Sequence, residues 1–153
     1  TRTRGLAPQE ALAGYIAYYL SPAHCNKPGQ GCAIPATAGD VARLEPEARK
    51  RFEAGASALQ RLIARQFEQA GFGAAEALNQ AAALLSELSG AVMMARAVKS
   101  PHMQKQICAS AHSAILQRLR RYWPDFGAKA QAEVEAAFAP LLSEDEDALS
   151  VGV

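Results

Sequence analysis

The sequence predicts an all-α fold, a bundle of about six helices, on three observations. Half of the 153 residues are hydrophobic and only 7% are aromatic. Alanine, the best helix former, is abundant and allows close helix packing. Apolar residues recur at spacings of three and four, and no alternating stretch rich in Val, Ile and Thr indicates a strand. Prolines and glycines divide the chain into segments of helical length, and the size fits one domain.

The first two expected helices flank an irregular loop. Pro8 suits the first turn of a helix over residues 8–20, since proline lacks only an N–H that would have no partner there. The Pro and Gly content of residues 21–32 argues against regular structure. A short helix is expected over residues 34–43.

The next two expected helices are long. One covers residues 46–70 and ends at Gly71 and Gly73. The other covers residues 75–98 and carries two apolar stripes. The stripes are Leu78, Ala81, Leu85, Leu88 and Val92, and Leu84, Leu88, Ala91, Ala95 and Val98. Such a face is too wide for a single neighbour, so this helix is either central in its subunit or shared between its core and a partner chain.

The remaining elements are a fifth helix over residues 101–121 and a sixth over residues 128–142. Ser100 is a suitable cap and Pro101 a suitable first residue for the fifth helix. An acidic tail begins at Glu144, after the sixth helix. We expect residues 1–121 to form the main functional domain, and residues 122–153 to add an extra helix and the tail to that domain.

Composition excludes several classes of protein. The formal net charge is +1, without the basic field on which nucleic-acid binding by this segment alone would depend. Three cysteines do not make a disulfide framework, which favours a reducing, cytoplasmic location. No apolar run approaches the roughly 20 residues of a membrane span. No paired carboxylates, phosphate loop or metal motif indicates an enzyme, and no cofactor is expected.

Several short motifs carry a resemblance to a known family. They are Tyr19-Leu20-Ser21 followed by His24, Gly31-Cys32, Gly39-Asp40-Val41-Ala42-Arg43, and Gly90-Ala91-Val92-Met93-Met94-Ala95-Arg96-Ala97-Val98 before Ser100-Pro101. In this order they resemble one branch of the ligand-binding domains of bacterial TetR-family transcriptional regulators. The resemblance spans residues 6–119. Cys25 and Asn26 stand where that branch usually has Arg and Asp, and residues 120–153 extend beyond it.

The resemblance implies a homodimer in which the helices over residues 75–98 and 101–121 pair with their twins as a four-helix bundle. It also implies a small, often apolar effector bound among the helices. Operator DNA would be contacted only through an N-terminal helix-turn-helix. Because the chain begins with Thr1 and not Met, we expect that part to precede it. The effector would shift the dimer geometry and release DNA, as in a repressor.

Site residues follow from this resemblance and from helical spacing. Tyrosine can line an effector cavity, and methionine adapts to varied ligands, although plain core packing is the alternative for both. The expected ligand-binding residues are Tyr15, Tyr19, Phe52, Leu84 and Met93. The expected dimer-interface residues are Leu85, Leu88, Val92, Ala95, Ile107, Ala111, Ala114 and Ile115.

The alternative function is a thiol-based redox or electrophile switch using Cys25 and Cys32. Cys32 lies at a loop–helix junction, where a helix N-terminus favours the thiolate, and Cys25 is near enough in sequence for a reversible disulfide. Simple burial of Cys32 is the competing interpretation. His24 is expected to anchor the loop. His24, Cys25 and Cys32 match no zinc pattern, so no metal is expected.

Overall fold

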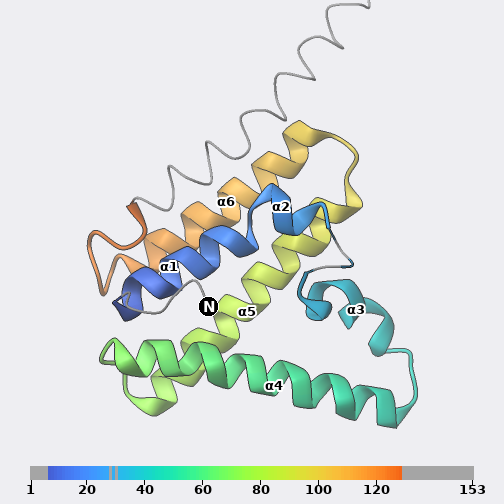
Figure 1. The fold of residues 1–153 in the computed structure, drawn as a ribbon, viewed down its shortest axis with the longest axis horizontal. Coiled ribbons are helices and arrows are strands. Elements are labelled where there is room, and N and C mark those ends of the chain that lie inside the picture. Colours follow the sequence, from blue (N-terminus) through green and yellow to red (C-terminus); the bar gives the residue numbers. More distant parts are fainter. Residues whose placement is uncertain (1–6, 28, 30, 129–153) are drawn as a thin grey trace, which may run out of the picture.

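The computed structural model describes residues 7–27, 29 and 31–128, which form an all-helical fold without strands (Figure 1). Its helices are α1 (Pro8–Tyr19), α2 (Pro22–Cys25), α3 (Ala33–Val41), α4 (Pro46–Gln69), α5 (Ala74–Ala97) and α6 (Pro101–Leu119). The predicted fold class is confirmed. The helices expected over residues 8–20, 34–43, 46–70, 75–98 and 101–121 are all present with small shifts at their ends. The helix expected over 128–142 and the acidic tail lie outside the described residues.

The loop expected over residues 21–32 contains one short helix, α2, that sequence reasoning missed. Ser21 caps it, because the Ser21 hydroxyl accepts a hydrogen bond from the His24 N–H at 3.4 Å. Pro22 occupies its first turn. A helix this short has no apolar periodicity that could reveal it, so only the Ser-Pro start was available as a signal.

Helix α5 is the central element, and it contacts every other helix of the described chain. In Figure 1 it runs diagonally from the end of α4 towards α6, which returns antiparallel beside it. Its buried positions are Ala77, Ala81, Leu84, Leu88, Ser89, Ala91, Val92 and Ala95. Most of the wide apolar face of α5 is therefore buried within this chain, as expected for a central helix, whereas Leu78 of that face is exposed and Leu85 and Val98 are half-buried.

The core joins α1, α4, α5 and α6. Its largest fully buried side chains are Phe67, Leu12, Ile16, Leu20, Leu84, Leu88, Ile115, Leu116, Leu119, His112 and Val92. Each such apolar side chain stabilises the fold by about 1.5–3 kcal/mol relative to exposure. These contacts hold α1 and α6 against α5. Within the described part of the chain, no helix has the length and apolar character needed to cross a membrane.

Residues after α6 extend the core with aromatic side chains. The ring of Trp123 stacks on Phe67 with centroids 6.2 Å apart, and it lies 5.1 Å from Phe72 and 5.5 Å from Phe126. The Arg120 Nε donates to the Phe126 carbonyl at 3.0 Å. The stretch between the helices expected over residues 101–121 and 128–142 therefore packs on the end of α4.

Candidate functional site

The chain between α1 and α3 is held by one imidazole ring. The His24 Nε2 accepts a hydrogen bond from the Cys32 N–H at 3.1 Å, so Nδ1 carries the proton and donates to the Tyr19 carbonyl at 2.7 Å. The ring is only 3% exposed and lies 4.4 Å from the Tyr19 ring. His24 thus joins the end of α1 to the start of α3, which confirms its expected anchoring role.

Burial lowers the pKa of His24, and the nearby positive charge of Arg96 lowers it further, while the hydrogen bond to the Tyr19 carbonyl opposes both. The imidazole is therefore neutral around pH 7. Neutrality is required here, because a protonated ring would have no acceptor for the Cys32 N–H.

Two residues of the family-like motifs support this ring. A Cβ at Gly31 would lie 2.7 Å from the His24 Nε2 and 3.2 Å from the Arg96 Nη2, so only glycine fits. Arg96 of α5 donates from Nε to the Cys25 carbonyl and from Nη2 to the His24 carbonyl, each at 3.1 Å. A cation at the end of a helix complements its exposed carbonyls. Arg96 therefore fixes α2 on α5.

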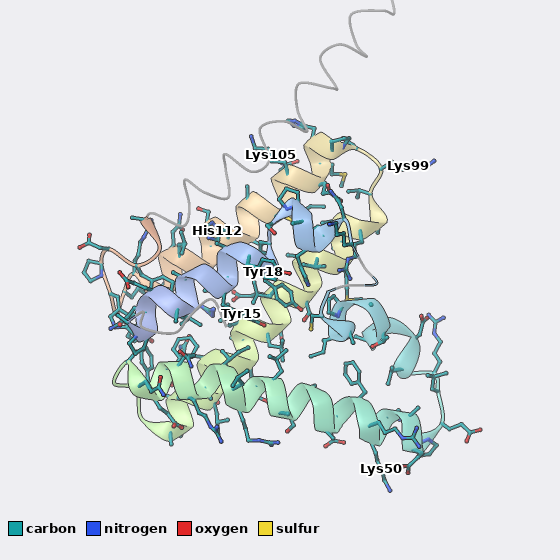
Figure 2. The ribbon with its side chains drawn as sticks, viewed as in Figure 1. Tyr15, Tyr18, Lys50, Lys99, Lys105 and His112 are labelled. Atoms are coloured by element: carbon teal, nitrogen blue, oxygen red, sulfur yellow. The ribbon has the colours of Figure 1, made fainter. Side chains whose placement is uncertain are left out.

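A cluster of hydroxyl and thiol groups lies beside the His24 ring. The rings of Tyr15 and Tyr19 are 5.7 Å apart, and both tyrosines lie near the Cys32 thiol. Figure 2 shows Tyr15 on α1, directed towards the interior. Burial raises the pKa of both phenols, and Cys32 raises it further. The hydroxyls of both tyrosines therefore remain neutral.

One cavity of about 520 Å³ lies between α3 and α4, and Leu85 of α5 contributes to its wall. Its lining residues are Ala38, Val41, Ala42, Arg49, Phe52, Glu53, Ala56, Ser57, Gln60 and Leu85. A second cavity of about 760 Å³ lies where α2, α3, the end of α5 and the start of α6 meet. Its lining residues are Cys25, Asn26, Pro35, Ala36, Met93, Arg96, Ala97, Val98, Lys99, Pro101 and Gln104. Both volumes fall within the roughly 300–1,000 Å³ of small-molecule sites.

The five expected ligand-binding residues do not share one cavity. Phe52 lines the α3–α4 cavity, Met93 lines the second, and Leu84 is fully buried in the core. Tyr15 and Tyr19 belong to the His24 cluster. Sequence reasoning missed Ala56 and Gln60, although their spacing from Phe52 on one face of α4 was a usable signal.

The residues expected at a dimer interface divide into three groups. Leu88, Val92, Ala95 and Ile115 are fully buried by this chain's own helices, so their side chains serve its core. Leu85 is half-buried and lines the α3–α4 cavity. The accessible members lie along one stripe of α6: Ile107 and Ala111 are half-buried and Ala114 is exposed.

The structure places the cysteines differently from the sequence hypothesis, which brought Cys25 and Cys32 together. The Cys25 sulfur lies 3.6 Å from that of Cys108, whereas Cys32 lies beside the tyrosines. All three are free thiols. No group of His, Cys, Asp or Glu side chains in the described ranges could hold a metal ion.

The described helices pack around the long central helix α5 and leave cavities between them. Residues 8–109, about two-thirds of the chain, match the family described as "Transcriptional regulator LmrA/YxaF-like, C-terminal domain". The chain belongs to this family of TetR-type regulator domains, and the resemblance drawn from its motifs is confirmed. No curated protein and no solved structure matches it.

Proposed function

We propose that the chain is the effector-sensing and dimerisation domain of a TetR-type repressor, and that the α3–α4 cavity holds the effector. The single observation that carries the effector site is the composition of that cavity. Its apolar walls come from α3, Leu85 and Phe52, while α4 adds Arg49 and Glu53 and other polar side chains. Mostly apolar walls with a few polar groups are typical of small-molecule sites.

The chemistry of the lining favours a small amphipathic molecule. Val41, Phe52 and Leu85 would contact an apolar body, whereas Arg49 and Gln60 would bind a hydrogen-bonding or anionic group. The Gln60 Nε2 already donates to the Leu78 carbonyl at 3.2 Å, which fixes this side chain on α5. Gln60 thus offers an oriented amide at the cavity wall.

The α3–α4 cavity borders α5, one of the two helices that the family uses for dimerisation. Leu85 lies on α5 two residues before Glu87, which forms an ion pair with Arg118 of α6 at 2.6 Å. A ligand that displaces Leu85 would therefore shift α5 where it is joined to α6. Such a ligand changes DNA release only by its differential affinity for the two dimer geometries.

The proposed dimer interface is an exposed face formed by α5 and α6, which we call the α5–α6 seam. On α5 it consists of Asn79, Ala83, Ser86, Glu87, Gly90, Met94 and Ala97. On α6 it consists of Met103, Ile107, Ser110, Ala111, Ala114 and Arg118. Residues three and four apart share one side of a helix, so each set forms a stripe, and the Glu87–Arg118 ion pair joins the two stripes. Small residues in such a stripe allow close helix contact.

Binding of 8-anilinonaphthalene-1-sulfonate, an amphipathic aromatic anion that fluoresces in apolar sites, tests the effector cavity. We expect saturable binding that Ala56→Trp weakens at least tenfold, about 1.4 kcal/mol, because the indole fills the cavity. Ala58→Trp is the matched control, since Ala58 is exposed on the same helix and lines neither cavity. Absence of saturable binding to the unmodified chain, or equal effects of the two substitutions, would contradict the cavity assignment.

A further inference from the structure

Two buried cysteines from distant parts of the chain lie in contact. Cys25 ends α2 and Cys108 lies within α6, 83 positions away, yet their sulfurs are 3.6 Å apart. They are 1% and 0% exposed. This contact joins the loop that follows α1 to a helix of the α5–α6 seam.

Cys25 is buried, but it borders the second cavity. It forms part of the wall of the second cavity, together with Arg96, Lys99 and Gln104. Figure 2 shows Lys99 at the turn between α5 and α6, with its side chain directed away from the fold. A small polar reagent bound among these groups would therefore lie next to Cys25, whereas Cys108 does not line the cavity.

The surroundings of the two thiols are unequal. The hydrogen bond with Cys108 lowers the pKa of Cys25, and Arg96 lowers it further, although burial opposes both. The same hydrogen bond raises the pKa of Cys108, and burial adds to that effect. Because Arg96 also binds the Cys25 carbonyl, its positive charge is held close. The thiolate therefore forms on Cys25 while the proton stays on Cys108, and the thiolate is the nucleophilic form of cysteine.

We propose that Cys25 and Cys108 form an oxidisable pair, in which Cys25 reacts with a hydroperoxide and Cys108 resolves the product as a disulfide. The Cys25 sulfur attacks the terminal peroxide oxygen and the O–O bond breaks. The alcohol (or water) leaves with the proton given up by Cys25, and a sulfenic acid remains. The Cys108 sulfur then attacks the Cys25 sulfur, the S–S bond forms, and the hydroxyl leaves as water with the Cys108 proton. Two thiols lose two electrons, and the peroxide gains them.

The geometry favours this pair over Cys25 and Cys32. A disulfide needs the two sulfurs at about 2.05 Å, and those of Cys25 and Cys108 are already in contact at 3.6 Å. Cys32 is held elsewhere, because its N–H is bonded to His24 and its thiol lies beside Tyr19. The new bond would tie α2 covalently to α6, so oxidation would limit movement between the α1–α3 region and the seam.

Peptide mapping after mild oxidation tests the pair on the folded chain. Reduced protein is treated with a few equivalents of hydrogen peroxide, and remaining thiols are then blocked with N-ethylmaleimide before digestion. We expect a Cys25–Cys108 disulfide peptide and blocked, unoxidised Cys32. This result uses the unmodified chain, so it does not depend on the folding of any variant. It is also independent of the α3–α4 effector cavity and of the seam.

Two variants test the roles of Cys108 and Cys32 in this reaction. Cys108→Ala should stop the reaction at the Cys25 sulfenic acid, trapped by dimedone, because the resolving thiol is gone. Cys32→Ser is the matched control and should leave the yield of the Cys25–Cys108 disulfide unchanged. A Cys25–Cys32 disulfide, disulfides only between separate chains, or oxidation of Cys32 with Cys25 intact would overturn the proposal.

Discussion

A single neutral histidine organises the loop between α1 and α3. His24 binds the Tyr19 carbonyl on one side and the Cys32 N–H on the other, and Arg96 holds the carbonyls next to it. These groups account for the Tyr-Leu-Ser, Gly-Cys and Ala-Arg-Ala motifs by which the family is recognised. The motifs therefore record a structural constraint on the loop, and they do not by themselves mark the effector site.

The contact between Gly31 and the His24 ring gives the first prediction. Gly31→Ala places a methyl group 2.7 Å from the His24 Nε2, and the ring cannot retreat without losing a hydrogen bond. Overpacking of this kind costs about 1–3 kcal/mol. Urea denaturation should show that loss in the free energy of unfolding. Gly29→Ala is the matched control from the same loop, since among the described residues no atom lies within 4 Å of its Cβ position. Equal stability of the two variants would contradict the proposed constraint.

The lowered pKa of His24 predicts a loss of stability in acid. The unfolded chain binds a proton at about pH 6.5, whereas the folded chain binds it only at lower pH. The unfolded state therefore carries more protons below that pH, and the free energy of unfolding falls as pH falls. The contribution of the neutral His24 ring to the free energy of unfolding is fully present above about pH 6.5. It is lost as the pH drops through the folded-state pKa of His24.

Urea denaturation from about pH 7.5 to about pH 5.5 measures this dependence. His24→Gln should give a shallower loss of stability over that range than the unmodified chain. His102→Gln changes an exposed histidine on α6 and should leave the dependence as it is. The same pH dependence in the chain with and without His24→Gln would rule out this role of the imidazole.

Among the elements, α5 has two faces with different uses. One face is buried against α1, α4 and α6, and the opposite face carries small exposed residues of the seam. Gly90 lies in the middle of that exposed face, and no atom of the residues that the structure describes lies within 4 Å of its Cβ position. A glycine in the middle of a helix is less favourable than alanine by roughly 0.5–1 kcal/mol. Close approach of a second copy would explain its presence.

The substitution Gly90→Arg therefore tests association of two chains through the seam while leaving the fold of each chain intact. The arginine has space in the isolated chain but would block close contact across the seam, so we expect sedimentation to show a shift from dimer to monomer with the helical content preserved. Gly55→Arg is the matched control, because Gly55 is helical with open space at its Cβ position but lies on α4. A dimer that tolerates Gly90→Arg as well as Gly55→Arg would place the interface elsewhere.

For the whole molecule, local patterns predicted the helices but not their neighbours. Pro8, Pro46 and Pro101 begin helices α1, α4 and α6, and apolar spacing predicted their lengths. The spacing of Leu88 and Val92 predicted a stripe, but periodicity does not say whether a stripe meets the chain's own core or a partner. Both residues are covered by this chain.

The site was less predictable for the same reason. Each cavity is lined by residues from several helices, so Phe52 and Met93 could be chosen as apolar candidates but not assigned to different cavities. Cys25 was paired with Cys32 because the two are close in sequence. Its actual neighbour, Cys108, comes from a helix whose packing no spacing rule predicts.

The distance between equivalent points of two protomers tests most directly whether an effector controls dimer geometry. A spin label at Gly14→Cys on α1, an exposed position with open space around it, can be placed in a chain whose own cysteines are replaced by alanine. Pulsed electron paramagnetic resonance then measures the separation between the two labels. We expect a defined distance that shifts on adding a compound whose binding Ala56→Trp weakens. Absence of any coupling between labels, or a distance unchanged at saturation with that compound, would contradict an effector-sensing dimer.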